Sequence, residues 1–485
     1  SRGAWVGARA LPPGPRGRCQ GRADPGEAPR RGACMRLAGW VLLTCASGGR
    51  GADNGLGITP PMGWRSWNSY GRRVNQSLME GIMDGMVRRK WKVDGVPTSL
   101  CDLGYCDVGL DDSWQKCSKG TYNYHDDDGR PVVNLKKFPS MQAMTARAHG
   151  LGLKAGWYGN NCICSEGKKP TKAMYEKDVE ALTAFGFDSL KLDKCGSMQD
   201  LNLWARLLNQ TGRPVMIENC HWGFTVPNAT WCPWHFFRTS GDIRAQYGSM
   251  VSTLLTTVRW AKAGLSRPGC WAYPDMMQVG CRHGPGGPSD PGMSYREARS
   301  HFGAWCIVSS PLILSHDVNS DAVMEEIWPI ISNREAIAVN QAWAGHSGSP
   351  FKQSATNITL PGFADQTRKP ILGDHGVAKG KETPLPSWHF FYKPLGSGRV
   401  AVLLMSHTEE EQSLTVSFAE VPGLSCSRCI VRDVWQRRDL GVHIERYAAK
   451  GLTGRDSAFL ILSPEPRASR QAFAELLRGA GKLRV

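Results

Sequence analysis

The chain has 485 residues, of which 41% are apolar and 21% are charged, and it contains 55 glycines, 18 tryptophans and 16 cysteines. This length and apolar content exclude a disordered chain and a coiled coil, and they predict one large domain with a smaller companion. Every longer apolar run is interrupted by glycine, proline or charge before it reaches the roughly 20 residues that a membrane-spanning helix needs. We therefore expect no membrane span.

The net charge of +16 by itself suggests a nucleic-acid partner or an anionic surface. Residues 1–52, however, hold nine arginines and two acidic residues, and without them the chain has 50 basic against 41 acidic residues, a net charge of +9. No run of lysine and arginine interleaved with aromatic residues remains. We therefore expect a solvated basic surface and no nucleic-acid binding.

The first 52 residues are typical of a processing segment. Met35 and Arg36 precede an apolar run of about 10 residues, which is the length of a signal-peptide core, and small residues follow as far as Ala52. We expect translation to begin at Met35, residues 1–34 to be an upstream leader, and cleavage to fall between Ala46 and Ala52. A short buried helix is the alternative. The predicted location is outside the cell or in a lysosome or vacuole, where four Asn-x-Ser/Thr sequons are candidates for glycosylation: Asn75, Asn209, Asn228 and Asn357.

Thirteen cysteines follow this segment, an odd number in a chain that is expected to meet an oxidising compartment. We predict a set of disulfides with at least one free thiol, and Cys306, inside an apolar helical stretch, is the candidate for a buried free one. Zinc binding is the competing interpretation. No CxxC pair is matched by a second pair or by spaced histidines, so we expect no metal and no other cofactor.

Eight short strand-like runs alternate with helical patterns over residues 53–350. The predicted strands are Met62 to Ser66, Tyr105 to Leu110, Leu153 to Tyr158, Phe187 to Leu192, Pro214 to Glu218, Trp234 to Arg238, Gly269 to Tyr273 and Pro311 to Ser315. The predicted helices are Pro139 to His149, Thr171 to Phe185, Met198 to Asn209, Gly248 to Ala263 and Ser294 to Val308. Eight alternations predict an α/β fold of the (β/α)8 TIM-barrel type. A doubly wound open sheet is the alternative, but no GxGxxG turn follows any strand.

The pattern changes after residue 350. A polar stretch over 351–387 is predicted to be a linker, and residues 388–463 contain short strands without helices between them, which predicts an antiparallel β-sandwich. The strands are expected at Trp388 to Tyr392, Arg399 to Met405, Ser413 to Phe418, Cys429 to Val434 and Ala458 to Leu462. Residues 464–485 are expected to form a basic tail.

Acidic residues gather at the predicted carboxyl ends of the strands, which is where active residues lie in a (β/α)8 barrel. One aspartate at such a place is most often a helix N-cap. Five strand ends with aspartate, beside tryptophan, lysine or arginine, instead favour glycoside hydrolysis, in which one carboxylate attacks or activates water and another protonates the leaving oxygen. Metal binding is the rival use, but no histidine and carboxylate ligand spacing supports it.

Five motifs at these strand ends resemble glycoside hydrolase family 27, the alpha-galactosidase and alpha-N-acetylgalactosaminidase family. They lie, in chain order, at residues 60–68, 109–114, 190–195, 238–243 and 273–276, and weaker similarity continues at 431–435 and 439–441. Each motif alone is weak, but five in order are specific. The resemblance implies a catalytic barrel followed by a β-domain.

The resemblance implies a retaining exo-acting alpha-galactosidase. Asp193 would be the nucleophile and Asp242 the general acid/base, in a double displacement that requires their carboxyl groups to lie about 5 to 5.5 Å apart. Lys191 and Arg238 are expected to keep Asp193 ionised, whereas Asp242 has to hold a proton.

The same resemblance assigns the substrate-binding residues. Asp111 and Asp112 would bind the 4- and 6-hydroxyls of galactose, so that a glucoside would leave buried polar groups unpaired. Trp67 would pack against the sugar ring. The other residues expected in the pocket are Tyr158, Lys191, Cys220, Trp222, Arg238 and Asp275.

Family members carry a disulfide beside the nucleophile, so Cys195 is expected to pair with Cys164 or with Cys162. His221 departs from the family pattern in the loop that faces the 2-substituent, where it either contacts substrate or is a structural histidine that points away. Tyr273 stands where the family commonly has aspartate, which leaves the role of Asp275 open.

The expected partner is a carbohydrate with a terminal alpha-linked galactose. The sequence leaves open whether the chain forms a homodimer. The alternatives within the family are an alpha-N-acetylgalactosaminidase and a beta-L-arabinopyranosidase. From another class, a sugar-binding protein without catalysis predicts a missing carboxylate, yet Asp193 and Asp242 are both present.

Overall fold

The computed structural model describes residues 54–119, 123–282, 290–367 and 383–465. The predicted leader and signal peptide, Met35 included, and all but the first two residues of the predicted basic tail lie outside the described residues.

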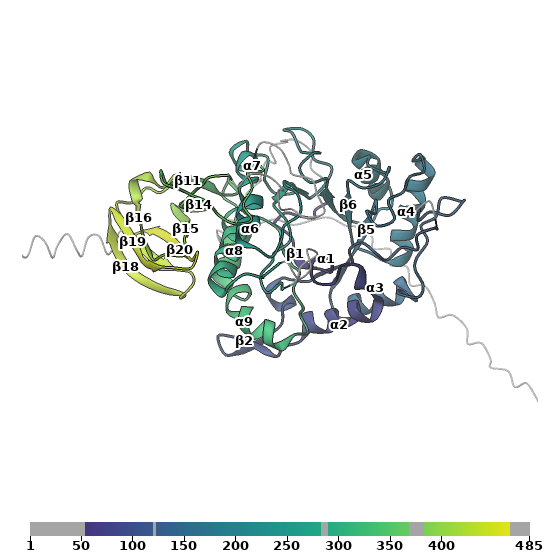
Figure 1. The fold of residues 1–485 in the computed structure, drawn as a ribbon, viewed down its shortest axis with the longest axis horizontal. Coiled ribbons are helices and arrows are strands. Elements are labelled where there is room, and N and C mark those ends of the chain that lie inside the picture. The colour runs from purple at the N-terminus through teal and green to yellow at the C-terminus, as the bar shows by residue number, and fades with distance from the viewer. Residues whose placement is uncertain (1–53, 120–122, 283–289, 368–382, 466–485) are drawn as a thin grey trace, which may run out of the picture. The chain divides into compact units, whose positions relative to one another are not determined.

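An eight-stranded parallel sheet forms the larger, N-terminal part of the described chain (Figure 1). Its strand order is β10-β1-β4-β5-β6-β7-β8-β9, which confirms the (β/α)8 prediction and all eight predicted strands within two residues at each end. The strands are β1 (Met62–Arg65), β4 (Asp107–Gly109), β5 (Lys154–Gly159), β6 (Ser189–Asp193), β7 (Met216–Cys220), β8 (Phe236–Arg238), β9 (Trp271–Tyr273) and β10 (Leu312–Leu314).

The barrel closes without a ladder between its last two strands. No register pairs β9 with β10 in the described chain, and the segment after β9 instead meets β10 through Met277 N, which donates to Ile313 O at 2.8 Å. All carboxyl ends of the parallel strands therefore still open at one mouth.

Helices cover the sheet, and most begin at a residue whose side chain accepts from a free backbone N–H of the first turn. Ser294 and Glu297, for example, form a reciprocal capping box. The helices are α1 (Trp67–Tyr70), α2 (Gln76–Val87), α3 (Met141–Gly150), α4 (Lys172–Phe185), α5 (Leu201–Gln210), α6 (Tyr247–Leu255), α7 (Val258–Lys262), α8 (Tyr295–Ile307), α9 (Asp321–Ile331) and α10 (Arg334–Gln341).

One predicted helix, Gly248 to Ala263, is two helices in the structure. The hydroxyls of Thr256 and Thr257, between α6 and α7, donate back to Thr253 O at 2.6 Å and to Leu254 O at 2.7 Å. Hydroxyl groups that bond to the preceding turn compete with the backbone ladder and bend a helix. The apolar periodicity of the sequence continues across Thr256 and Thr257, so the periodicity did not reveal that the helix is interrupted there.

The C-terminal part is an antiparallel β-sandwich, as predicted. One sheet has the order β11-β14-β15-β20-β17-β18, and β16 pairs with β19 in a second sheet. The strands are β11 (Ser349–Gln353), β14 (Trp388–Gly396), β15 (Arg399–Ser406), β16 (Gln412–Ser417), β17 (Arg428–Asp433), β18 (Arg438–Ile444), β19 (Arg446–Leu452) and β20 (Ser457–Pro464). Two short antiparallel ladders complete the strands: the hairpin of β2 (Trp91–Val93) with β3 (Val96–Thr98), and the pairing of β12 (Asn357–Ile358) with β13 (Leu385–Pro386).

Two features of the sandwich differ from the sequence prediction. β11 pairs with β14, so residues 351–353 of the expected linker belong to the sheet. The strands β18 and β19 were not predicted. β18 lies at the sheet edge with most of its residues exposed, so it lacks the apolar alternation that identifies a half-buried strand.

Helix α8 contacts β14, β15 and β20 of the sandwich. Lys393 on β14 is fully buried beside the barrel helices, and its Nζ donates to the carbonyls of Val339 at 2.5 Å and Asn340 at 2.8 Å, near the end of α10. Burial lowers the pKa of this ammonium to about 7. The lysine satisfies carbonyls that the helix leaves free at its C-terminus.

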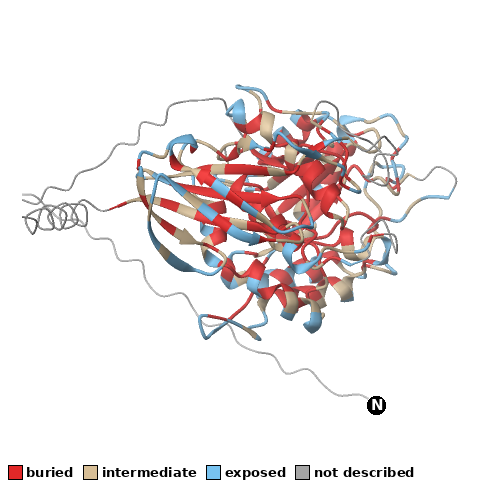
Figure 2. Cartoon of the chain, turned by 60° about the vertical axis from the view of Figure 1, so that its left-hand side comes forward, coloured by how far each residue is buried: buried red, intermediate tan, exposed pale blue. Residues whose placement is uncertain are grey.

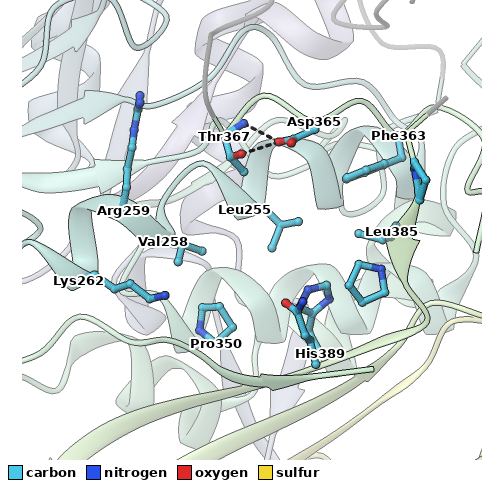
Figure 3. A pocket seen from close by; sticks show the side chains of 13 residues that line it. Leu255, Val258, Arg259, Lys262, Pro350, Phe363, Asp365, Thr367, Leu385 and His389 are labelled. Carbon is cyan, nitrogen blue, oxygen red and sulfur yellow. Dashed lines mark hydrogen bonds between the residues drawn. The ribbon is translucent and has the colours of Figure 1, made fainter. Parts of the chain in front are cut away.

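A hollow of about 410 Å³ lies where α6 and α7 approach β11, β14 and residues 363–367 (Figure 3). His389 lines this hollow, its Nδ1 contacts His407 Nε2 at 2.9 Å, and His407 Nδ1 contacts the Tyr247 hydroxyl at 3.0 Å. None of the predicted site residues lines this hollow.

Buried residues follow the strands and the inner faces of the helices, whereas exposed residues gather in loops and turns (Figure 2). Among the described residues, no helix combines the length and the apolar character needed to cross a bilayer.

The close contact between α6 and residues 361–363 leads to a test of stability. A Cβ at Gly248 would lie 2.1 Å from Pro361 O and 2.5 Å from Phe363 N. We expect Gly248→Ala to lower the free energy of unfolding by about 1 to 3 kcal/mol, because backbone has to move. Gly150→Ala, on a helix position with no atom within 4 Å, is the control and should be neutral or slightly stabilising. Urea unfolding of both variants checks this, and equal stabilities would contradict it.

Candidate active site

The register of the parallel sheet brings the predicted site residues to one mouth. Asp193 ends β6 directly opposite Cys220, which ends β7, and Arg238 ends β8 opposite Tyr273 of β9. Asp111 and Asp112 follow β4, and Asp275 follows β9. With Tyr158 on β5, six neighbouring strands, β4 to β9, thus supply the candidate catalytic and binding groups.

Asp193 has two unequal carboxylate oxygens. The Tyr158 hydroxyl donates a short hydrogen bond to Oδ2, and Lys191 Nζ lies 3.9 Å from the same atom. Oδ1 is buried and accepts from neither Tyr158 nor Lys191, and the neighbouring Cys220 thiol also favours the ionised carboxylate by lowering the pKa of Asp193. Asn160 fixes the backbone beside the carboxylate, since its Nδ2 donates to Asp193 O at 2.7 Å. One oxygen is therefore held while the other is free for chemistry.

Burial raises the pKa of Asp193 to about 6, and the nearby Lys191 ammonium offsets part of that rise. The Tyr158 hydroxyl acts in the same direction as Lys191, because a hydrogen bond to the ionised carboxylate favours that form. Tyr158 itself stays protonated, since burial raises its own pKa well above its ordinary value.

Lys191 supplies the positive charge on the side of the barrel mouth where Asp193 lies. Its Nζ lies 2.8 Å from Asp111 Oδ2, and both side chains are at most 4% exposed. Ser66, directly after β1, accepts from Asp111 N through its hydroxyl at 3.0 Å. Asp111 is thus oriented by neighbours on two other strands.

Asp112 accepts from four donors. Ser113 N and Gln115 Nε2 reach Oδ1, both at 2.5 Å, and the backbone N–H groups of Cys162 and Ile163 reach Oδ2 at 3.0 and 2.9 Å. These donors come from two different loops. Asp112 therefore connects the segment after β4 to the segment after β5. A sugar hydroxyl that bonds to Asp112 would share a carboxylate oxygen with these donors.

Arg238, which was expected to help keep Asp193 ionised, instead forms its ion pairs with two other carboxylates at the mouth. Its Nη2 lies 2.9 Å from Asp242 Oδ1 and 2.8 Å from Asp275 Oδ2. Asp275 also accepts from Ile243 N at 2.8 Å, next to Asp242, and its pKa is raised by burial and held down by Arg238. Asp275 and Arg238 thus position Asp242, whose side chain is 47% exposed against 8% for Asp193.

Cys220 is the last residue of β7, and Trp222 lies in the turn that follows. Cys220 is a buried free thiol whose sulfur accepts from Arg238 Nη1 at 3.4 Å, and burial raises its pKa well above the ordinary range. His221 uses Nδ1 for a 2.8 Å contact with the Thr225 hydroxyl of its own turn, and burial lowers its pKa to about 4. The Thr225 contact favours the structural alternative left by the sequence, while Nε2 of the ring is buried and no described residue bonds to it.

Trp67 packs partly buried against the aromatic cluster formed by Phe236, Trp271 and Tyr273 at the centre of the barrel. Beneath the mouth, Arg65 Nη2 lies 2.8 Å from a Glu218 carboxylate oxygen, with both side chains buried. Sequence reasoning did not place Arg65 in the site, although it stands inside the first of the five motifs. Glu218, the last residue of the fifth predicted strand, was counted among the acidic strand ends, but no role was assigned to it.

The disulfide beside the nucleophile joins Cys162 to Cys195. Cys164, which was also considered as a partner of Cys195, is bonded to Cys117. Cys162 contacts the Tyr158 hydroxyl, whereas Cys164 is directed away to the segment after β4. The described residues contain three further disulfides, Cys101–Cys106, Cys232–Cys270 and Cys426–Cys429, and three buried free cysteines, Cys220, Cys281 and the predicted Cys306.

Two family models match the chain. Residues 59–342 match the model described as alpha galactosidase A, and residues 386–462 match the alpha galactosidase C-terminal beta sandwich domain. Because the first model alone covers more than half of the sequence, the chain belongs to the alpha-galactosidase A family. The resemblance seen in the five motifs is thereby confirmed.

Curated relatives and solved structures agree with this family. The alpha-galactosidase of Cyamopsis tetragonoloba is 30% identical over 416 residues, which cover 82% of this chain and 87% of the relative. The alpha-galactosidase of Oryza sativa is 31% identical and covers 80% and 81%. The structure of alpha-galactosidase I from Mortierella vinacea superposes with a TM-score of 0.67 at 24% identity, covering 85% of this chain and 99% of that one.

A beta-L-arabinopyranosidase of the same glycoside hydrolase family, from Geobacillus stearothermophilus, has a TM-score of 0.64 at 17% identity, with coverage of 84% and 97%. The fold is therefore shared by enzymes with different named substrates.

The buried contact of Lys191 leads to a second test of stability. Lys191→Met removes the ammonium and leaves Asp111 buried without its closest cation. We expect the free energy of unfolding at pH 7 to fall by about 3 to 5 kcal/mol. Lys172→Met breaks an exposed pair with Glu176 one helical turn away and should cost no more than about 0.5 kcal/mol. Urea unfolding compares them, and an unchanged stability of Lys191→Met would show that Asp111 does not depend on this cation.

Proposed function

We propose that the chain is a retaining, exo-acting alpha-galactosidase that removes terminal alpha-linked galactose from oligosaccharides or glycoconjugates. The observation that carries this proposal is the unequal environment of two carboxylates at the barrel mouth. Asp193 is buried with one oxygen held by Tyr158 and the other free, whereas Asp242 is half exposed and oriented by Arg238. Two carboxyl groups with different surroundings suit the two roles of glycoside hydrolysis.

In the first step, Asp193 Oδ1 forms a bond to the anomeric carbon as the glycosidic bond breaks, and Asp242 gives its proton to the leaving oxygen. In the second step, Asp242 takes a proton from water, and the water oxygen displaces Asp193 from the anomeric carbon. Two inversions return the original anomeric configuration. Lys191 and Tyr158 stabilise the ionised form of Asp193 that the first step needs.

Selectivity for galactose would come from Asp111 and Asp112 at the 4- and 6-hydroxyls. Both are buried and oriented by their neighbours, so a sugar without matching hydroxyls leaves them unpaired. Cys220 and the bulky Trp222 would face the 2-hydroxyl and exclude an acetamido group. The alternatives are the alpha-N-acetylgalactosaminidase and beta-L-arabinopyranosidase specificities and, outside enzymes, a sugar-binding protein without catalysis.

The proposed route is secretion or delivery to a lysosome or vacuole. The five disulfides support an oxidising compartment. Among the sequons, Asn209, Asn228 and Asn357 are exposed and are the proposed glycosylation sites, whereas Asn75 is half-buried and accepts from Leu78 N at the start of α2.

Hydrolysis of nitrophenyl glycosides tests the proposed activity. We expect turnover of the alpha-galactoside and little of the alpha-N-acetylgalactosaminide or beta-L-arabinopyranoside. Asp193→Ala should lower kcat by about 10⁴-fold or more, and Asp242→Ala by about 10² to 10⁴-fold. Asp188→Asn, at the other end of β6, is the matched control and should stay active. Proton NMR should detect alpha-galactose as the first product. Release of the beta anomer would contradict the retaining mechanism, and no turnover by the folded wild-type protein would favour the binding-protein alternative.

The pKa of Asp193 predicts the acid side of the pH profile. Since the nucleophile has to be ionised, kcat/KM should fall as the pH drops through about 6, the pKa to which burial raises this carboxyl. Tyr158→Phe removes a donor to the ionised form, so the pKa of Asp193 rises further and the acid limb moves to higher pH. Tyr105→Phe, which removes a buried hydroxyl bonded to Ile331 O, is the control. If the two variants have the same acid limb, Tyr158 does not set the pKa of Asp193.

A further inference from the structure

The segment from Asn160 to Lys168, between β5 and α4, touches both halves of the proposed sugar site. Its N–H groups at Cys162 and Ile163 donate to Asp112, and Asn160 donates to the backbone carbonyl of Asp193. A displacement of this segment would move a sugar-binding carboxylate and the nucleophile together. What holds the segment in place therefore bears on binding.

The segment has no regular secondary structure, and cross-links hold it. Cys162 and Cys164 are in separate disulfides, to Cys195 after β6 and to Cys117 after β4. The third anchor is not covalent. The side chain of Glu166, buried at 1% exposure, accepts from the backbone N–H groups of Tyr124 and His125, each at 3.2 Å.

His125 lies between two buried carboxylates. Its Nδ1 is 3.0 Å from Glu166 Oε2, and its Nε2 is 3.0 Å from Asp178 Oδ1 on α4. The imidazole and the Glu166 side chain are fully buried, and the Asp178 side chain is 2% exposed. The three residues connect the segment after β4, the segment after β5 and helix α4. We name them the His125 cluster.

The two contacts of the ring fix the number of protons in the His125 cluster. A neutral imidazole has one N–H, yet both of its nitrogens face carboxylate oxygens. Both hydrogen bonds exist only if one additional proton is present, on the second ring nitrogen or on one of the carboxyl groups. In either case the cluster has a net charge of −1. When that proton leaves, a nitrogen lone pair faces a buried carboxylate and one hydrogen bond is lost.

The other groups around the His125 cluster do not supply this proton. The Tyr124 hydroxyl donates to Asp178 Oδ2 at 3.4 Å, and burial keeps its pKa well above the ordinary value. Lys168 donates through Nζ to the carbonyl of His125 at 3.2 Å. On α4, Tyr175 is a further titratable neighbour of Asp178, and burial, with a smaller contribution from the charges of Asp200 and Asp178, raises the pKa of its phenol.

We propose that the His125 cluster is a positioning element of the active site, in which one shared proton holds the segment from Asn160 to Lys168 against Asp112 and the backbone of Asp193. Loss of that proton weakens sugar binding. The proposal rests on the proposed function, because it takes Asp112 as a sugar-binding residue. It assigns no contact with substrate to His125.

The direction of the pH effect follows from the surroundings of the ring. Burial by itself lowers the pKa of His125, but Asp178 and Glu166 outweigh it and raise the pKa above its ordinary value. A histidine with a raised pKa in the folded state stabilises the fold below its unfolded pKa, and that contribution is lost as the pH rises through the folded pKa. The segment should therefore be held at acid and neutral pH and loosen on the alkaline side.

Calorimetric titration with D-galactose at pH 6 and pH 9 tests the proposal. We expect the Kd of the wild-type enzyme to rise about tenfold between these values, the loss that corresponds to one hydrogen bond. Asp178→Asn should remove most of this rise, because an Asn amide donates to the Nε2 lone pair while Nδ1–H still donates to Glu166. Both ring nitrogens are then satisfied without the additional proton.

His149→Gln is the matched control. His149 contacts Asp188 at 2.8 Å, so it also pairs a histidine with a carboxylate, but it lies at the end of α3, away from the segment. Its pH dependence of Kd should equal that of the wild type. If Asp178→Asn has the wild-type pH dependence, or if the alkaline effect appears only in kcat, the proposal is wrong.

Hydrogen exchange separates this proposal from the proposed function. The amides of Cys162 and Ile163 should lose protection between pH 6 and pH 9 in the wild type, after correction for intrinsic rates, and should keep it in Asp178→Asn. If protection depends on pH but the protein does not bind galactose, the positioning role is supported and the galactosidase proposal is wrong. Equal protection at both pH values in the wild type would overturn the positioning role.

Discussion

The contact between Lys191 and Asp111 is the interaction on which the rest of the mouth depends. A (β/α)8 barrel collects the carboxyl ends of its strands at one place, and this chain puts several carboxylates there, most of them buried. Buried carboxylates repel one another and lose hydration, so they stay ionised only where cations or hydrogen-bond donors face them. Lys191 serves Asp111 at 2.8 Å and Asp193 at 3.9 Å, and so supports a binding residue and the candidate nucleophile together.

The mouth is divided between two cations. Lys191 forms ion pairs with Asp111 and Asp193, whereas Arg238 forms ion pairs with Asp242 and Asp275. This division gives the two candidate catalytic carboxylates different surroundings on neighbouring parts of one surface. Asp193 is enclosed and partly held, and Asp242 is accessible to a leaving group or to water. A retaining mechanism needs such a difference, because one carboxylate attacks while the other exchanges a proton.

Segments without regular structure complete the site, and they are fixed by long-range cross-links. Two disulfides and the His125 cluster hold the residues after β5. A loop that donates two backbone N–H groups to Asp112 has to be held to within a few tenths of an ångström, since a hydrogen bond weakens quickly with distance. Covalent bonds restrict the path of the chain, and the buried ionic contacts then restrict its orientation.

The sequence by itself determined the order of the eight strands, the sandwich that follows, and the strand ends where Asp111, Asp193 and Asp242 lie. These features depend on local periodicity and on short motifs, which are legible in a single chain. Only the tertiary structure decided that Cys162 and not Cys164 joins Cys195, that Arg238 serves Asp242, and that His125 joins two carboxylates 41 and 53 residues away. Those choices are between partners of similar chemistry, so they follow from distance and burial in the folded chain.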